Sequence, residues 1–177
     1  MQALVVYESM FGTTRDVARA IGNGLFPVMD VDLVEVGTAT CLVDTDLLVV
    51  GGPTHAFGMS RSSTRQDAAR QAAHATVSVD DGVREWLERV LPAVPGLAAA
   101  AFDTRVASPR VPGSAAKAIH RRLRRLGFEP VVPAESFWVD GTQGPLASGE
   151  AERAREWGAH LADLVAHRAH RTHGMSV

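Results

Sequence analysis

The sequence predicts an α/β fold in which a parallel β-sheet is covered by helices on both faces. Apolar segments rich in β-branched residues alternate along the chain with segments whose apolar residues recur at helical spacing, which is the pattern of repeated β-α-β crossovers. One of the apolar segments is a continuous run of leucine and valine, as expected for a strand buried on both faces. The chain has 177 residues, which suits one such domain and leaves little room for a second.

Five segments are expected to form the strands, in the order 3–7, 28–36, 47–50, 97–102 and 128–139. The second alternates apolar and acidic residues, as an edge strand with one face in water would. The third is the continuous run of leucine and valine and is followed by Gly51 and Gly52, so we expect it at the centre of the sheet. The fourth is rich in alanine and by itself fits either a strand or a helix.

Four segments are expected to form helices, namely 14–25, 80–91, 113–126 and 149–166. Each has apolar residues spaced three and four apart, which places them on one face of a helix. The second helix is expected to begin at an acidic capping residue, Asp80. The third carries a strongly basic outer face.

Two segments fall outside this alternating pattern. Residues 53–79 are polar and rich in Ser, Thr and Arg, so we expect a long loop at the carboxyl edge of the sheet, where loops of α/β proteins carry function. The last residues are rich in His and Arg, and we expect them to fray. The chain is therefore predicted to form one domain, residues 1–166, followed by a C-terminal tail, residues 167–177.

Composition and charge restrict the partners and the compartment. The formal net charge is −2, so no overall field attracts nucleic acid or an anionic membrane. Cys41 is the only cysteine, which excludes a disulfide framework and a multi-cysteine metal site and favours a reducing compartment. Met1 leads into the first apolar segment without a basic region, and no apolar stretch of about 20 residues occurs. We expect a soluble, cytoplasmic protein.

The segment between the first strand and the first helix has the composition of a phosphate-binding loop. Its residues are Ser9, Met10, Phe11, Gly12, Thr13 and Thr14. The first turn of a helix has free backbone N–H groups and a partial positive charge, and hydroxyl donors added there can hold a phosphate without a lysine. The alternative is an ordinary helix cap made by Thr13 or Thr14. A cap needs one hydroxyl, whereas three surround a glycine here, so we favour phosphate binding.

Other classes of nucleotide site and catalytic site lack their required residues. A Walker-type loop needs a lysine, and a dinucleotide-binding loop needs three spaced glycines, whereas this loop has no lysine and a single glycine. A receiver domain needs an acidic residue at the end of the third strand, where Gly51 and Gly52 stand. A serine hydrolase of the α/β type needs a Gly-x-Ser-x-Gly turn after a strand, which does not occur.

Residues 5–21 resemble the flavodoxin signature along their whole length. The matching features are two aliphatic residues and an aromatic, Val5-Val6-Tyr7, then the hydroxyl of Ser9, the small Gly12 and the threonine and alanine that follow, Thr14 and Ala18. The resemblance implies a flavodoxin-like, doubly wound sheet of five parallel strands in the order 2-1-3-4-5, with helices on both faces and FMN at the switch point between strands one and three. It places the FMN phosphate on residues 9–14.

The same resemblance places the flavin ring between the loops after strands three and four. The residues so assigned are Pro53, Thr54, His55, Ala56, Phe57 and Gly58 in the first loop and Asp103, Thr104 and Arg105 in the second. Phe57 is expected to stack on the ring, although it could instead be an apolar plug beneath a long loop. Gly58 resembles the hinge of the family, whose peptide can flip to hydrogen-bond the reduced ring.

The second ring loop departs from the family because it has no tyrosine to cover the outer face of the ring. Tyr7, the only tyrosine, lies inside the first strand, so the outer face is either open or covered by a side chain such as His55 or Arg105. Nearby arginines would stabilise the anionic reduced flavin. The candidates are Arg105 and Arg110, with Arg61 and Arg65 from the segment 61–65. We therefore hypothesise a less negative potential than that of acidic carriers; the alternative is that Asp103 and Arg105 pair with each other.

These observations predict an FMN-binding protein that transfers electrons to and from redox partner proteins. It would be an electron carrier or an FMN-dependent oxidoreductase, and we name no catalytic residue. The alternative is a flavodoxin-fold interaction or regulatory module that has lost the flavin. The C-terminal histidines have few accompanying ligands and favour adventitious metal affinity over a metal centre. The basic run 120–125 is either the solvated face of a helix or a docking site for an acidic redox partner.

Overall fold

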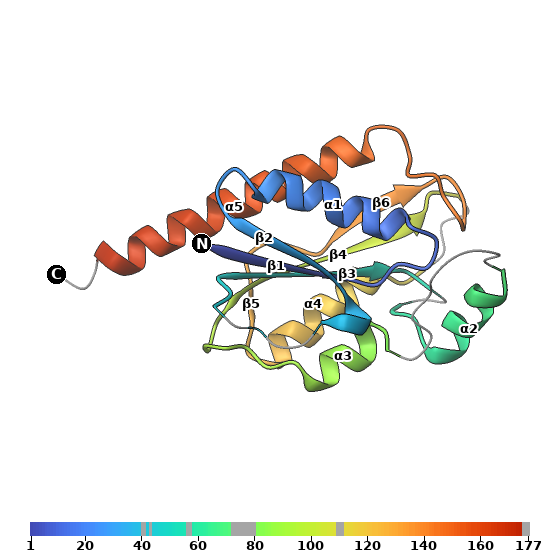
Figure 1. Ribbon diagram of the computed structural model, residues 1–177, viewed down its shortest axis with the longest axis horizontal. Coiled ribbons are helices and arrows are strands. Elements are labelled where there is room, and N and C mark those ends of the chain that lie inside the picture. The colour runs from blue at the N-terminus through green and yellow to red at the C-terminus, as the bar shows by residue number, and fades with distance from the viewer. Residues whose placement is uncertain (40–41, 43, 56–57, 72–80, 109–111, 175–177) are drawn as a thin grey trace.

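The structure is a computed structural model that describes residues 1–39, 42, 44–55, 58–71, 81–108 and 112–174 (Figure 1). The strands are β1 (Gln2–Tyr7), β2 (Asp30–Glu35), β3 (Leu47–Pro53), β4 (Ala98–Val106), β5 (Glu129–Pro130) and β6 (Glu135–Val139). The helices are α1 (Thr13–Leu25), α2 (Ser62–Gln71), α3 (Val83–Arg89), α4 (Ala115–Arg125) and α5 (Glu150–Gly174), with a short 3-10 helix, η1 (Val36–Thr38), after β2.

The strands form one parallel sheet with the order β2-β1-β3-β4-β5, and β6 also pairs with β4. The predicted order 2-1-3-4-5 is therefore confirmed, with β2 at one edge and the Leu/Val run of β3 at the centre. The alanine-rich segment, which the sequence left open between strand and helix, is strand β4. Its alanine side chains are small, and Ala99, Ala100 and Ala101 are completely buried between the two layers of helices.

The predicted fifth strand is two strands rather than one. β5 pairs with Ala98 and Ala99, and β6 pairs with β4 from Phe102 onward. The four residues 131–134 thus lie opposite only two residues of β4, so the extra residues cannot pair with β4 as a regular strand would. Pro133 lies within this segment and has no N–H to donate to a neighbouring strand.

The segment 53–79, predicted as an irregular loop, contains helix α2. Its sequence is mostly polar, and Arg65 and Ala68 are its described buried residues, so it lacks the apolar stripe by which a helix is recognised in a sequence. Figure 1 shows α2 beyond the carboxyl ends of the strands. The predicted cap Asp80 lies outside the described residues; in the structure Gly82 precedes α3, and its N–H donates to the Glu85 carboxylate.

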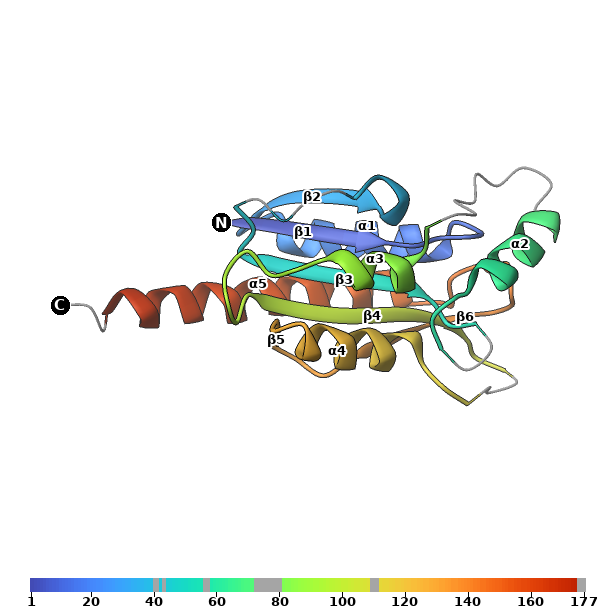
Figure 2. The same cartoon turned by 90° about the horizontal axis from the view of Figure 1, so that it is seen from below.

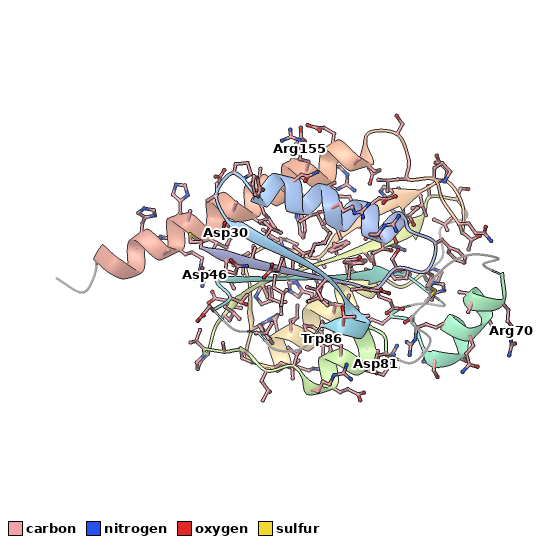
Figure 3. The ribbon with its side chains drawn as sticks, in the orientation of Figure 1. Asp30, Asp46, Arg70, Asp81, Trp86 and Arg155 are labelled. Carbon is pink, nitrogen blue, oxygen red and sulfur yellow. The ribbon has the colours of Figure 1, made fainter. Side chains whose placement is uncertain are left out.

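Helices α1 and α5 cover one face of the sheet, and α3 and α4 cover the other (Figures 1 and 2). Each face has its own apolar core, in which Val5, Ile21 and Leu161 represent the first. On the second face the side chain of Trp86 from α3 is 1% exposed and packs in the cluster with Leu48 (Figure 3). The predicted coverage of both faces is confirmed.

Helix α5 continues past the predicted domain boundary at residue 166 to Gly174, and its last part projects beyond the sheet (Figure 1). Residues 167–174, predicted as a separate tail, are helical in the structure, and residues 175–177 lie outside the described part of the chain. In the described part, no helix combines the length and the apolar character that a membrane span requires.

Candidate functional site

A cavity of about 210 Å³ lies at the carboxyl edge of the sheet, where the strand order reverses between β1 and β3. It is lined by Met10, Phe11, Thr13, Thr14, Pro53, Thr54, His55, Thr104, Val139 and Thr142. Eight of these ten residues belong to the predicted FMN site. The cavity thus brings together the loop after β1, the loop after β3 and the end of β4, and His55 is the one titratable side chain among the described residues that line it.

The loop after β1 has its backbone N–H groups turned toward one oxygen. The N–H groups of Gly12 and Arg15 both donate to Ser9 Oγ, at 3.1 and 3.3 Å. Gly12 has a φ of +93°, which favours glycine and lets the chain turn from the strand into α1. Such a concave arrangement of amides at a helix start is suited to an anionic oxygen.

Neither threonine of this loop is the helix cap. Gly12 occupies the cap position of α1 without a side-chain hydrogen bond, and Thr13 and Thr14 are the first two helical residues. Thr14 is 1% exposed, and its hydroxyl shares a 2.8 Å hydrogen bond with the hydroxyl of Thr104. This bond joins the start of α1 to the end of β4 across the floor of the cavity.

The first predicted ring loop leaves β3 as a closed turn. The Thr54 N–H donates to Thr104 O, and His55 and Gly58 exchange two backbone hydrogen bonds of 2.9 and 2.8 Å. Ala56 and Phe57, which lie between them, fall outside the described residues, so the predicted ring stacking stays a prediction. Gly58 has open space where a Cβ would stand.

His55 is partly buried, and burial lowers its pKa below the ordinary value of 6.5. The neutral imidazole is therefore favoured at pH 7, and it offers one donor and one acceptor to a ligand in the cavity.

Two arginines hold the residues that follow the turn. The Arg84 guanidinium donates to the carbonyl oxygens of Met59 and Ser60, both at 3.0 Å. Arg65, which is fully buried, donates to Ser60 Oγ at 3.0 Å. The exit of the loop is thus fixed to α2 and α3, and no motif in the sequence indicated this arrangement.

Arg65 also lies in a buried cluster of charges with Glu8 and Glu85. Its Nη1 atom is 3.2 Å from Glu85 Oε2. Glu8 is 5% exposed; its Oε2 accepts from the Val83 N–H, and its Oε1 has no hydrogen-bond partner among the described residues. Burial is the main cause that raises the pKa of Glu8 above its ordinary value of 4.5, against the lowering effects of Ser60, the Val83 N–H and Arg65.

The hypothesis that Arg65 stabilises a reduced flavin is weakened by this placement, because its charge is balanced by Glu85. Arg110 lies outside the described residues, and Arg61 is exposed.

The second predicted ring loop is strand, because β4 continues to Val106. Asp103 is fully buried, and its Oδ2 accepts hydrogen bonds from Thr54 Oγ1, Ser114 Oγ and the Ala116 N–H at 2.6–2.9 Å. It therefore holds the first turn of α4 and does not line the cavity. The alternative pair of Asp103 with Arg105 is not among the ion pairs of the described residues, in which the other oxygen, Oδ1, has no hydrogen-bond partner.

Arg105 lies over the ring of Trp138, with its guanidinium carbon 5.4 Å from the ring centroid. Ser9, Gly12, Gly58 and Arg105 do not line the cavity, although they belong to the elements that border it.

The sequence analysis missed the third wall of the cavity, formed by Val139 and Thr142. The loop that carries Thr142 packs on the start of α1 at Gly144, whose φ is +98° and where a Cβ would stand 2.6 Å from Thr13 Cγ2. The sequence did contain a feature that could have indicated this wall. The segment 140–145 contains two glycines directly after a strand, and the carboxyl ends of parallel strands meet at one edge.

No group of three or more His, Cys, Asp or Glu side chains that could hold a metal ion occurs within the described residues. The rings of His167 and His170 on α5 are each hydrogen-bonded through Nδ1 to the backbone carbonyl four residues earlier.

Comparison with known proteins shows similarity in structure but not in sequence. No protein-family model matches the chain, and no curated protein matches it. Among solved structures, a flavodoxin from the domain Archaea has a TM-score of 0.67 at 21% identity, over 94% of this chain and 99% of that one. Oxidised flavodoxin 1 from Bacillus cereus has a TM-score of 0.66 at 14% identity, with coverages of 92% and 98%. A flavodoxin from Streptococcus pneumoniae has a TM-score of 0.61 at 16% identity, with coverages of 95% and 99%.

These matches span nearly the whole of each chain, so the chain has a flavodoxin-like fold. At these identities the similarity establishes the fold and leaves the ligand to be argued from the residues of the cavity.

Proposed function

We propose that this protein binds FMN at the carboxyl edge between β1 and β3 and transfers electrons between partner proteins in the cytoplasm. The observation that carries the proposal is the convergence of the Gly12 and Arg15 N–H groups on Ser9 Oγ, next to a cavity lined by five threonines. Amides and hydroxyls at a helix start suit a phosphate dianion. No carboxylate lines the cavity among the described residues, so no fixed negative charge opposes it.

The residues present fit FMN in two respects. The phosphate would be held by the loop 9–14, and the ring would lie toward the turn 53–58, with Thr104, Val139 and Thr142 on the remaining sides. FMN supplies the electron-transfer chemistry when it is bound, whereas the protein positions it and sets its surroundings. Burial lowers the pKa of His55, so its neutral imidazole is favoured at pH 7 and would offer one donor and one acceptor to the ligand.

Binding of FMN and of riboflavin, which lacks the phosphate, tests the proposal. The wild-type protein is expected to quench FMN fluorescence and to bind FMN more tightly than riboflavin. Ser9→Ala removes the oxygen on which the loop amides converge, and a hydrogen bond to a charged group contributes about 1.5–3 kcal/mol, so FMN affinity should fall about tenfold or more. Riboflavin affinity should not change.

Thr14→Ser is the matched control, because it keeps the hydroxyl that meets Thr104. A purified protein that is colourless and does not bind added FMN would contradict the proposal and favour the alternative, an interaction module that has lost the flavin. Equal losses of FMN and riboflavin affinity in Ser9→Ala would contradict the assignment of the phosphate to this loop.

A further inference from the structure

The outer face of α4 is a strip of positive charge. Lys117, Arg121 and Arg124 are exposed and spaced four and three residues apart, so they lie along one side of the helix. The opposite side, with Ile119 and Leu123, is buried against the sheet. Arg122 and Arg125 raise the number of cations on α4 to five, and the helix contains no acidic residue.

These cations are not neutralised by neighbours within the described part of the chain. The eight ion pairs found there involve no residue of α4. Helix α5 is different, since its Arg153 and Arg155 both pair with glutamates. The 13 other Lys and Arg residues of the chain stand against 20 Asp and Glu, so the rest of the protein carries −7 and the charge is strongly asymmetric.

Helix stability does not account for the whole strip. Cations near the end of a helix interact favourably with its dipole, which covers Arg122, Arg124 and Arg125 in the last turn of α4. Lys117 lies in the first turn, where the dipole disfavours a positive charge.

The strip begins beside the candidate FMN site. The first N–H groups of α4, at Ala115 and Ala116, donate to Thr54 Oγ1 and Asp103 Oδ2, and Thr54 lines the cavity. Eleven helical residues span about 16 Å, whereas a standard protein interface covers about 800 Å² on each partner, or roughly 30 Å across. A protein seated on α4 therefore reaches the edge of the cavity. Figure 2 shows α4 on the outside of the sheet, next to α3.

We propose that the outer face of α4 docks an acidic surface of a redox partner protein. The proposal rests on the proposed function, because it assigns the strip to the partner with which the bound flavin exchanges electrons. A protein fits better than a nucleic acid for two reasons. The charge of −7 on the rest of the protein repels a polyanion long enough to extend beyond the strip, and the exposed residues of α4 include no aromatic side chain on which a base could stack.

The test compares two triple variants that lower the net charge equally on opposite faces of the FMN-loaded protein. The strip variant is Lys117→Gln/Arg121→Gln/Arg124→Gln. The control is Arg19→Gln/Arg155→Gln/Arg171→Gln on α1 and α5, where all three arginines are exposed and Arg155 points away from the sheet (Figure 3). The acidic probe is a reduced plant-type [2Fe–2S] ferredoxin, which donates an electron to the protein. The basic probe is cytochrome c, which accepts an electron from the protein and tests a partner of opposite charge. Each passes one electron, and stopped-flow absorbance gives the rate constants.

Electrostatic steering predicts that the wild-type rate with ferredoxin falls about tenfold between 10 and 200 mM ionic strength. At 10 mM the strip variant should react with ferredoxin about fivefold more slowly and with cytochrome c faster, whereas the control variant should change either rate by less than about twofold. Equal effects of the two variants in FMN-loaded protein would overturn the docking proposal alone. A wild-type protein that takes up no FMN would overturn the proposed function as well.

Two further measurements test whether the outer face of α4 binds something other than an acidic protein. Strip-dependent binding of a 20-base-pair DNA duplex at 150 mM salt, read by fluorescence anisotropy, would assign α4 to nucleic acid and overturn the proposal. Strip-dependent dimerisation in sedimentation would assign it to a second copy of the chain, with the same consequence. Monomeric protein without DNA binding supports the docking of an acidic protein.

Discussion

The loop after β1 and the end of β4 border the same cavity, yet they use their polar groups in opposite ways. In the loop, the amides of Gly12 and Arg15 converge on a single hydroxyl oxygen, that of Ser9. At the end of β4, the Asp103 carboxylate accepts three hydrogen bonds, two of them from the first turn of α4. The first arrangement is local to the loop that borders the cavity, whereas the second joins β4 to the first turn of α4 and is part of the fold. A polar residue at the carboxyl edge is therefore a candidate ligand only if the neighbouring helix does not require it.

Replacing Asp103 should produce the largest effect and tests this contrast directly. Asp103→Ala leaves two hydroxyls and the Ala116 N–H without their buried acceptor, so the free energy of unfolding in urea should fall by about 3–5 kcal/mol. Asp103→Asn keeps an acceptor oxygen and should lose less.

Flavin binding distinguishes the two roles of Asp103. If it serves only the fold, Asp103→Asn protein that remains folded should bind FMN with nearly wild-type affinity. A folded Asn variant with little loss of stability and strongly weakened binding of both FMN and riboflavin would show instead that Asp103 contacts the ring.

Two glycines with positive φ in the loop after β6 test the proposed role of the loop 9–14. Gly144 and Gly149 have φ values of +98° and +81°, so alanine at either position should cost about 1–2 kcal/mol of stability. Only at Gly144 would the new Cβ meet another group, Thr13 Cγ2 at 2.6 Å, whereas Gly149 has open space. Gly144→Ala should therefore displace the phosphate loop and weaken FMN binding about tenfold in a fluorescence titration. Gly149→Ala is the matched control and should leave FMN affinity unchanged; equal weakening in both variants would show that general strain is the cause.

The same contrast explains how much of the site could be predicted from the sequence. Most strands were predictable from contiguous apolar runs of strand length, and their order followed from the resemblance of the contiguous residues 5–21 to the flavodoxin signature. The position of the loop 9–14 between a strand and a helix was predictable for the same reason, and its binding of phosphate stays a prediction. The role of Asp103 was not predictable, because it depends on Ser114 and Thr54, which come from different segments. A carboxylate in the sequence carries no sign that distant donors will surround it.

Two further differences have the same origin. Helix α2 is held by the buried side chain of Arg65, which bonds Ser60 and Glu85, rather than by an apolar stripe, so periodicity could not reveal it. The wall at Val139 and Thr142 was missed because the predicted fifth strand was treated as one element. Its division into β5 and β6 brings the end of β6 beside the end of β4.

Glu8 provides the smallest expected effect and extends the comparison to a second buried carboxyl group. One oxygen of each group has no partner among the described residues, but the bonded oxygen of Asp103 accepts three hydrogen bonds and that of Glu8 accepts one, from the Val83 N–H. Burial raises the pKa of Glu8 above 4.5, so in the folded protein it keeps its proton to higher pH than in the unfolded chain. Its contribution to stability is complete below about pH 4.5 and is lost as the pH rises through the raised pKa.

Glu8→Gln should therefore gain stability relative to the wild type as the pH rises from 4.5 toward neutrality. Urea unfolding of both proteins at several pH values between 4.5 and 8 measures this difference, in which the titration of all other groups cancels to first order. Glu88→Gln, which removes an exposed carboxylate from the neighbouring α3, is the control for the loss of one negative charge. The stability difference between Glu8→Gln and wild type could instead stay flat or fall with rising pH. That result would mean that Arg65 and the Val83 N–H outweigh burial and that Glu8 is held as a carboxylate, like Asp103 in β4.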